Sequence, residues 1–179
     1  MPSVDEFNRL PDQAAREALG PCCSSGRWID AIVAGRPYPG MDALLAASDA
    51  AVAALGVKDL EQALAGHPRI GDRRVTADGP AGWSGQEQAG VAGAGAAMRQ
   101  ALADGNAAYE RRFGHIYLAC ATGRNAAELL ELLRERLDNG AAAEWHVVAA
   151  ELAKINQIRL RKLAGDPRPG DTARAGGTP

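Results

Sequence analysis

Aromatic side chains are scarce in this chain of 179 residues: they make up 4% of it, although 46% of its residues are hydrophobic. The apolar share is therefore largely Ala and Leu, with Val and Ile in support. Such a composition favours close-packed helices over a β-sandwich, because strands are enriched in aromatic and β-branched residues. A chain of this length fits one domain with a real core. We therefore expect an all-α fold, a single-domain multi-helix bundle.

Strong charge, long apolar runs and a cysteine framework are also missing. The formal net charge is −2, so no basic field attracts nucleic acid. No apolar run approaches the roughly 18–20 residues that span a bilayer, and the N-terminus lacks a signal-peptide pattern. Three cysteines, two of them adjacent, do not make a disulfide framework. We expect a cytoplasmic protein with neither a nucleic-acid nor a membrane partner.

Capping residues, prolines, glycines and apolar spacing predict a series of helices along the chain. The expected N-caps include Ser3, either Ser24 or Ser25, and Asn125. The residues after Gly165 are rich in Pro, Gly, Thr and Arg, so the domain is expected over 1–164 and a disordered tail over 165–179. The polar stretch 72–82 is expected to be a surface loop. The expected helices span about 3–10, 11–20, 25–33, 42–55, 58–65, 84–113, 125–137 and 141–163.

Two features interrupt this helical pattern. Gly90, Gly93 and Gly95 weaken the block over 84–113, since each costs up to about 1 kcal/mol against Ala, and they indicate a bend or a close helix contact. The stretch 114–121 is the one run rich in β-branched and aromatic residues. We expect this stretch to be extended or irregular, and buried.

His67 lies in Gly66-His67-Pro68-Arg69-Ile70-Gly71, between two helical blocks. The following proline disfavours helical backbone at the histidine, and the flanking glycines mark a loop. A histidine held on a stiff loop can face a cleft, and its ordinary pKa of about 6.5 suits proton transfer near neutral pH. The alternative is that His67 merely caps the preceding helix.

The spacing Ser84-x-x-Glu87 allows two interpretations. In a capping box, Ser84 bonds the amides of a helix start and Glu87 reaches back. In a binding site, Glu87 accepts hydrogen bonds from substrate N–H groups. The spacing alone favours the structural interpretation.

Arg159 belongs to the basic stretch 154–163, in which Ile155, Ile158 and Leu163 are candidates for the core face. Most charges of this stretch are expected to form a solvated face. One arginine at the rim of the apolar stripe could instead reach a cleft and hold a carboxylate.

The sequence offers little support for a metal site or for a nucleophilic cysteine. His67, His115 and His146 lack ligand spacing, and no Cys-x-x-Cys or tight carboxylate cluster is present, so no metal is expected. Cys22 and Cys23 are expected to pack at a helix start, and buried thiols are usually inert.

Short motifs follow one another in order over about residues 3–163. They are Cys22-Cys23-x-Ser25 with Arg27-Trp28, His67-Pro68-Arg69-Ile70-Gly71, Trp83-Ser84 with Gln86-Glu87-Gln88-Ala89-Gly90, Asn106-x-x-Tyr109-x-x-Arg112-Phe113-Gly114, Cys120-Ala121-Thr122-Gly123-Arg124, and Lys154-Ile155 with Ile158-Arg159-Leu160. Each motif alone is weak, but the ordered set is specific. It resembles the 2-oxo-4-hydroxy-4-carboxy-5-ureidoimidazoline (OHCU) decarboxylase family of uric acid degradation.

The resemblance implies an all-helical carboxy-lyase that needs no cofactor, usually forms a homodimer, and converts a small ureidoimidazoline substrate to (S)-allantoin. It implies that His67 is the catalytic acid/base and that Glu87 and Arg159 are catalytic partners. Tyr117 and Ala119 fall where some relatives carry Phe and Ile, which alters the pocket but spares backbone contacts. The substrate-binding residues it implies are Pro68, Ser84, Gln88, Tyr117, Ala119 and Gly123.

The chemistry of such a reaction fits these residue types. Decarboxylation leaves an electron pair on carbon, and the substrate's own imidazoline C=N and ureido system can accept it. Our hypothesis is that Arg159 holds anionic substrate oxygen, Glu87 fixes the ureido N–H groups, and His67 handles the proton. A helical scaffold without turnover and a hydrolase of ureido compounds are the alternatives.

Overall fold

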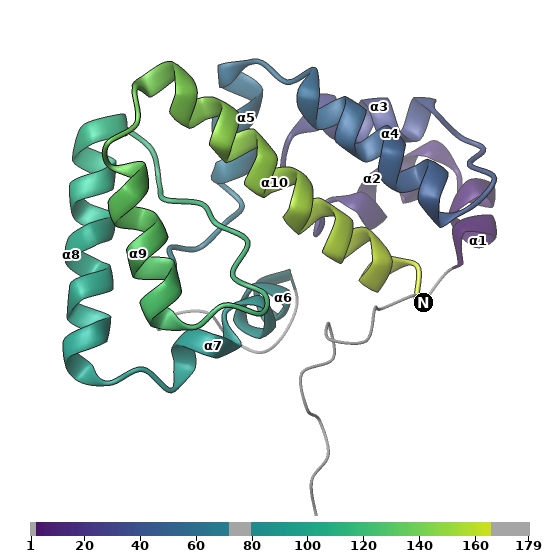
Figure 1. Ribbon diagram of the computed structural model, residues 1–179. Coiled ribbons are helices and arrows are strands. Elements are labelled where there is room, and N and C mark those ends of the chain that lie inside the picture. Colours follow the sequence, from purple (N-terminus) through teal and green to yellow (C-terminus); the bar gives the residue numbers. More distant parts are fainter. Residues whose placement is uncertain (1–2, 72–79, 166–179) are drawn as a thin grey trace, which may run out of the picture.

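The computed structural model describes residues 3–71 and 80–165, with side chains described from residue 83 in the second range. The described residues form helices and no strand, which confirms the all-α expectation (Figure 1). None of these helices is both long and apolar enough to cross a membrane. The helices are α1 (Val4–Arg9), α2 (Asp12–Leu19), α3 (Gly26–Ala34), α4 (Met41–Ala53), α5 (Val57–Leu64), α6 (Pro80–Glu87), α7 (Ala89–Ala92), α8 (Ala96–Phe113), α9 (Ala126–Arg136) and α10 (Ala141–Leu163).

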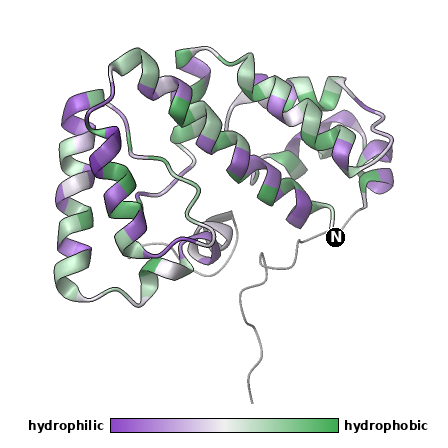
Figure 2. Cartoon of the chain, viewed as in Figure 1, coloured by the Kyte–Doolittle hydropathy of each residue, from purple (hydrophilic) through white to green (hydrophobic). Residues whose placement is uncertain are grey.

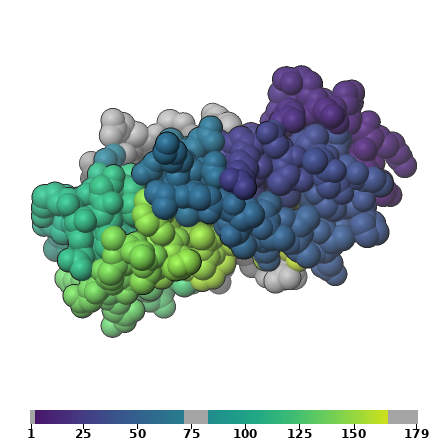
Figure 3. All heavy atoms as spheres, turned by 90° about the horizontal axis from the view of Figure 1, so that it is seen from above, coloured from purple at the N-terminus to yellow at the C-terminus, as the bar shows by residue number. Residues whose placement is uncertain are grey.

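The long helix α10 joins the two ends of the molecule. It packs on α4 and α5, while α8 and α9 pair with each other at the opposite end from α1–α4 (Figure 1). The space-filling view shows α10 against the chain near α5, between the N-terminal helices and the α8–α9 pair (Figure 3). Hydrophobic and hydrophilic residues alternate along α8, α9 and α10, as expected for helices with one apolar face (Figure 2).

Two hydrophobic cores follow from this arrangement. The first is built by α1–α5 and α10 around the fully buried Trp28, whose indole N–H donates to Ser48 Oγ at 3.3 Å. The second is built by α8 and α9 with part of the stretch 114–121. Along that stretch Leu118 belongs to the first core, and Tyr117 and Ala119 belong to the second. The chain there is non-helical and largely buried, as predicted, and it runs along the boundary between the cores.

Several helix boundaries are confirmed by their caps. Ser3 accepts from the backbone of Glu6 in a capping box, and Ser25 accepts from the N–H of Trp28. Asn125 forms a second capping box with Glu128 at the start of α9. The last helix spans the predicted residues 141–163.

The block predicted over 84–113 is not one helix, because the chain forms α6, α7 and α8 there with breaks at Gln88 and at 93–95, and the second break includes two of the glycines expected to weaken the block. Gly90 lies inside α7, where a Cβ would lie 2.1 Å from the carbonyl oxygen of Arg124, so the close contact expected near these glycines is present. The loop expected over 72–82 is wrong for 80–82, which open α6. The rest of that loop and the tail 166–179 lie outside the described residues.

Candidate active site

A small pocket lies at the boundary between the two cores, with a cavity volume of about 20 Å³. That is room for one or two water molecules, so a larger ligand must displace some of the surrounding side chains. Its walls come from the loop after α5, from α6, from the stretch 114–121 and from α10. They comprise His67, Pro68, Ile70, Ser84, Glu87, Gln88, Tyr117, Leu118, Ala119, Ala121, Thr122 and Ile155.

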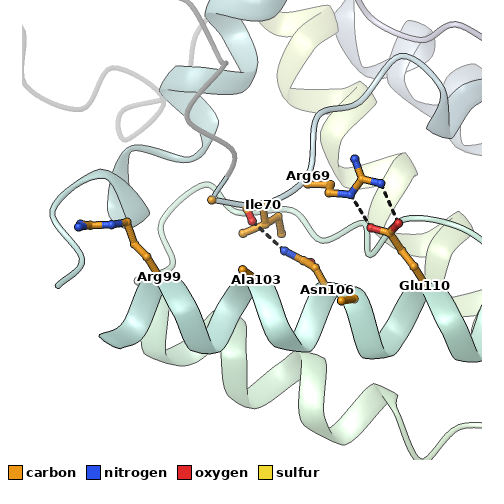
Figure 4. Close-up of a pocket in the computed structure, with 8 residues that line it drawn as sticks. Arg69, Ile70, Arg99, Ala103, Asn106 and Glu110 are labelled. Atoms are coloured by element: carbon orange, nitrogen blue, oxygen red, sulfur yellow. Dashed lines mark hydrogen bonds and ion pairs between the residues drawn. The ribbon is translucent and has the colours of Figure 1, made fainter. Parts of the chain in front are cut away.

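The loop that carries His67 is anchored on α8. Asn106 donates from Nδ2 to the carbonyl of Ile70 at 2.9 Å, and Arg69 forms two bonds of 2.5 and 2.7 Å with the carboxylate of Glu110 (Figure 4). These contacts fix the backbone immediately after the Pro68 turn. The larger concavity drawn in Figure 4 lies on the α8 side of the same loop.

Gln88 holds the loop from the other side. Its Oε1 accepts from the backbone N–H of Gly71 at 2.8 Å, and its Nε2 donates to the carbonyl of Arg69 at 3.4 Å. Gly71 has a φ of +84°, in the left-handed region that favours glycine. Gln88 lines the pocket as predicted, and its amide also positions the loop of His67.

The imidazole of His67 is set for proton transfer. Its Nε2 is buried and makes no hydrogen bond with any described group, whereas its backbone N–H donates to the carbonyl of Leu64. The turn after α5 is therefore made by the backbone, and the side chain has no capping role there. Burial, reinforced by the positive charge of Arg159, lowers the pKa of His67 from 6.5 to about 3. The ring is therefore neutral at physiological pH, and its Nε2 has a free lone pair, but the lowered pKa makes it a weak base in this structure.

Arg159 and Glu87 form a buried two-point ion pair beside His67. The guanidinium Nε and Nη2 donate to the two carboxylate oxygens of Glu87, each at 2.9 Å, and Nη2 also donates to Ser84 Oγ at 3.0 Å. The remaining nitrogen, Nη1, donates to the carbonyls of Pro21 and Cys22 at 3.3 and 3.4 Å. Arg159 and Glu87 are only 3% and 8% exposed, so a charged ligand that enters the pocket meets little competing water.

The capping interpretation of Ser84-x-x-Glu87 is wrong. Ser84 lies inside α6, which begins at Pro80, and its side chain accepts from Arg159. Arg159 and Arg161 are both buried, so two of the charges in stretch 154–163 do not lie on the solvated face expected there.

The stretch after α8 forms the opposite wall of the pocket. The hydroxyl of Tyr117 donates to the carbonyl of Leu129 at 3.1 Å, so its polar end is engaged in the second core. Ala119 lines the pocket and is 5% exposed. Gly123 is exposed, with a φ of +80°, and lies next to Thr122, which lines the pocket.

The other side chains considered for catalysis or metal binding, Cys22, Cys23 and His115, do not line this pocket. Burial raises the pKa of the Cys22 thiol to about 12, and burial also raises that of Cys23, so both are poor nucleophiles. His115 packs against Trp145, with ring centroids 4.2 Å apart. Within residues 3–71 and 80–165, no three His, Cys, Asp or Glu side chains gather as a metal site would require.

The sequence analysis missed a group of buried charged side chains behind the wall. Arg136, Glu144 and Glu151 are 3%, 0% and 5% exposed. Their positions in α9 and α10 have ordinary helical spacing, and the only available signal was that Glu144 and Glu151, seven residues apart, share a face with the apolar stripe of α10.

A histidine with an unpartnered nitrogen and a buried arginine–glutamate pair at one small pocket are the groups that a small-molecule enzyme uses for acid–base and electrostatic catalysis. The family described as OHCU decarboxylase matches residues 8–161 of the chain. The chain belongs to the OHCU decarboxylase family.

Individual relatives agree with this assignment. An Amia calva 2-oxo-4-hydroxy-4-carboxy-5-ureidoimidazoline decarboxylase is 32% identical over 76% of this chain and 79% of its own length. One of the same name from Haloferax volcanii is 23% identical over 88% of this chain and 94% of its own. The Arabidopsis thaliana "Uric acid degradation bifunctional protein TTL" is 30% identical over 81% of this chain, which spans 46% of that protein.

Solved structures show the same fold. An OHCU decarboxylase crystallised in the presence of (S)-allantoin superposes with a TM-score of 0.71 at 27% identity, covering 88% of this chain and all of the other. An (S)-allantoin synthase superposes with a TM-score of 0.68 at 16% identity over 93% of this chain and 54% of its own.

Proposed function

We propose that this chain decarboxylates 2-oxo-4-hydroxy-4-carboxy-5-ureidoimidazoline to (S)-allantoin, with His67, Glu87 and Arg159 as its catalytic residues. The observation that carries the proposal is that His67, with its unpartnered Nε2, and Glu87 line the same pocket, while Arg159, which does not line it, is bonded to the lining residues Glu87 and Ser84. Membership of the OHCU decarboxylase family supplies the substrate class.

In this proposal Arg159 binds the anionic substrate. Its guanidinium already donates to five acceptor atoms in a nearly dry site, so a substrate carboxylate or oxyanion must share or replace the bonds to Glu87. Glu87, partly released from Arg159, can then accept from the ureido N–H groups. The exchange couples substrate binding to a rearrangement of the pair.

His67 moves the proton. The bond between the ring carbon and the carboxylate breaks, CO₂ leaves, and the electron pair passes into the C=N and ureido system of the substrate. One proton then adds to the neighbouring ring carbon, which carries the ureido group, and the hydroxyl of the first carbon loses its proton to become the carbonyl of allantoin. An anionic substrate beside the ring offsets the positive charge of Arg159, which raises the pKa of His67 from its low value. The imidazole can then accept a proton from the bound substrate and return it to one face, which accounts for a single enantiomer. Residues Pro68, Ser84, Gln88, Tyr117, Ala119 and Gly123 are proposed to shape the substrate site.

The test is circular dichroism at an allantoin band, with urate oxidase and hydroxyisourate hydrolase supplying fresh substrate. Optical activity should rise much faster with the purified chain than without it, and the rise should scale with its concentration. A rate equal to that of the spontaneous reaction would count against the proposed decarboxylase activity.

We also propose that the chain acts as a cytoplasmic homodimer. Its described cysteines are free, which suits a reducing compartment, and the family resemblance supports the dimer. Sedimentation equilibrium on the purified chain tests the assembly, and a single species at the monomer mass of 18.6 kDa would contradict it.

A further inference from the structure

The wall segment Tyr117–Ala119 belongs to no helix, so no helical hydrogen bonds fix its backbone. Two charged side chains from the neighbouring helices hold it instead. Arg136 of α9 donates from Nη1 to the carbonyl of Leu118 at 2.6 Å. The backbone N–H of Cys120 donates to Oε2 of Glu151 in α10 at 2.7 Å. The two held peptide groups lie on either side of Ala119.

Arg136 is itself fixed from several sides. Its Nε donates to Glu144 Oε1 at 2.8 Å, its Nη2 donates to the hydroxyl of Tyr109 at 3.2 Å, and its guanidinium lies 4.9 Å from the ring centroid of Tyr117. Because Glu144 is 0% exposed, this arrangement has no room to shift without breaking bonds of a buried charge.

Glu151 is fixed in a similar way. Its Oε1 accepts from Lys154 Nζ at 2.5 Å, and Arg124 Nη1 lies 3.6 Å from its Oε2. Hydrogen bonds to an ionised carboxylate are shorter and stronger than neutral ones. The N–H of Cys120 is therefore held more tightly than a neutral acceptor would hold it.

Ala119, between these two contacts, has a backbone N–H and a carbonyl with no hydrogen-bond partner in the described part of the chain. Buried peptide groups are nearly always paired, so an unpaired edge on a pocket wall points to a ligand. Successive residues of an extended chain direct their N–H and C=O groups to opposite sides. Holding Leu118 and Cys120 from the α9 and α10 side therefore directs the groups of Ala119 toward the pocket that it lines.

We propose that Arg136 and Glu151 are positioning residues, which hold the peptide groups on either side of Ala119 so that its free N–H and C=O meet the amide-like groups of the substrate. The inference rests on the proposed function, since a ureidoimidazoline supplies the complementary N–H and C=O groups. Neither side chain touches the substrate in this arrangement.

Two substitutions of Glu151 separate positioning from ion pairing. Glu151→Ala removes the acceptor for Cys120 and the ion pairs with Lys154 and Arg124. Glu151→Gln removes the ion pairs but keeps an oxygen that can accept from Cys120. Small misplacements of a bound substrate can lower rates by about a hundredfold, so kcat/KM should fall roughly ten- to a hundredfold in Glu151→Ala and recover most of that loss in Glu151→Gln.

Glu128→Ala is the matched control, because Glu128 also accepts from a backbone N–H at 2.7 Å, that of Asn125 in the α9 cap. It should lower the melting temperature and leave kcat/KM unchanged. Equal turnover in the two Glu151 variants, or an equal loss in Glu128→Ala, would overturn the proposal.

Amide hydrogen exchange keeps this inference separate from the proposed function. Should the wild-type chain fail to turn over the substrate, the proposed function fails, while exchange at Cys120 and Ala119 still tests the positioning contacts. Faster exchange of the Cys120 amide in Glu151→Ala than in Glu151→Gln and wild type supports them. Identical exchange in all three proteins would overturn them.

Discussion

Two buried arginine–glutamate pairs have almost the same chemistry and different surroundings. Arg136–Glu144 is 3% and 0% exposed, and Arg159–Glu87 is 3% and 8% exposed. Glu144 is saturated by donors: its Oε1 accepts from Arg136 and the hydroxyl of Tyr109, and its Oε2 accepts from Asn139 at 2.7 Å. Glu87 makes hydrogen bonds to Arg159 alone among the described residues, and it faces a pocket.

The difference teaches that burial of an ion pair does not by itself mark a site. The saturated pair has no bond to offer a ligand, and breaking it leaves a buried charge uncompensated. The pair in the pocket lies beside the unpartnered His67 Nε2 and can exchange partners with a ligand. Unused hydrogen-bonding capacity next to a cavity distinguishes the functional pair from the structural one.

The largest effect is expected at the pocket, from His67→Asn. Asparagine keeps a similar volume and some hydrogen bonding but cannot transfer the proton, and general acid–base catalysis is typically worth about 10²–10⁴-fold. The turnover rate from the circular dichroism assay should fall by that order, with little change in melting temperature near neutral pH. A near-normal rate would assign His67 to structure.

The saturated pair should give a comparable effect on stability. Glu144→Gln leaves Arg136 with an uncompensated buried charge, and losing one partner of such a pair typically costs about 3–5 kcal/mol. Denaturant unfolding at neutral pH measures the loss. A decrease below about 1 kcal/mol would show that the saturated pair is not the structural centre of the second core.

A smaller effect is expected on the pH dependence of stability. The lowered pKa of His67, about 3 against 6.5, means that the unfolded chain binds a proton between these values that the folded chain does not. The contribution of neutral His67 to the free energy of unfolding is therefore fully present above about pH 6.5. It is lost as the pH falls toward 3, by up to about 1.4 kcal/mol per pH unit. The contribution of His67 to this pH dependence should be absent in His67→Asn. If the difference in free energy of unfolding between wild type and His67→Asn stays constant from about pH 7 to pH 4, the lowered pKa of His67 is contradicted.

The smallest effect is expected from a chelator. No described residues form a metal cluster, and the proposed chemistry uses only His67, Glu87 and Arg159. Incubation with EDTA followed by desalting should leave kcat and KM unchanged. Loss of activity that added zinc restores would require a different mechanism.

Local signals predicted much of this fold, because helix caps depend on a few neighbouring residues. Ser3, Ser25 and Asn125 cap the helices that they were expected to cap. The block over 84–113 was predicted less well. Its glycines indicated a bend or a close contact, but the contact itself joins Gly90 to the carbonyl of Arg124, a distant part of the chain that local spacing does not identify.

The candidate site was predictable as a set of residues but not as an arrangement. Arg159 and Glu87 are 72 residues apart, and their pairing depends on how α6 packs against α10. Local spacing instead favoured a capping box for Ser84 and Glu87, a structure that the start of α6 at Pro80 rules out. The charged side chains behind the wall were missed for the same reason, since helical spacing does not reveal which charge finds a buried partner.

The central claim is that the Arg159–Glu87 pair takes part in catalysis at the pocket, whereas the saturated pair acts only by holding structure, including the Leu118 carbonyl that Arg136 binds. The direct measurement is kcat/KM for Glu87→Gln and Glu144→Gln at a temperature at which both variants are folded. Loss of the charge at Glu87 should lower kcat/KM roughly ten- to a hundredfold, because charge-assisted hydrogen bonds are worth about 1.5–3 kcal/mol. Folded Glu144→Gln should stay within a few-fold of wild type, because glutamine keeps an oxygen that can accept from Arg136 and so leaves Arg136 in place on the Leu118 carbonyl. Normal turnover by Glu87→Gln together with a large loss in Glu144→Gln would contradict the account.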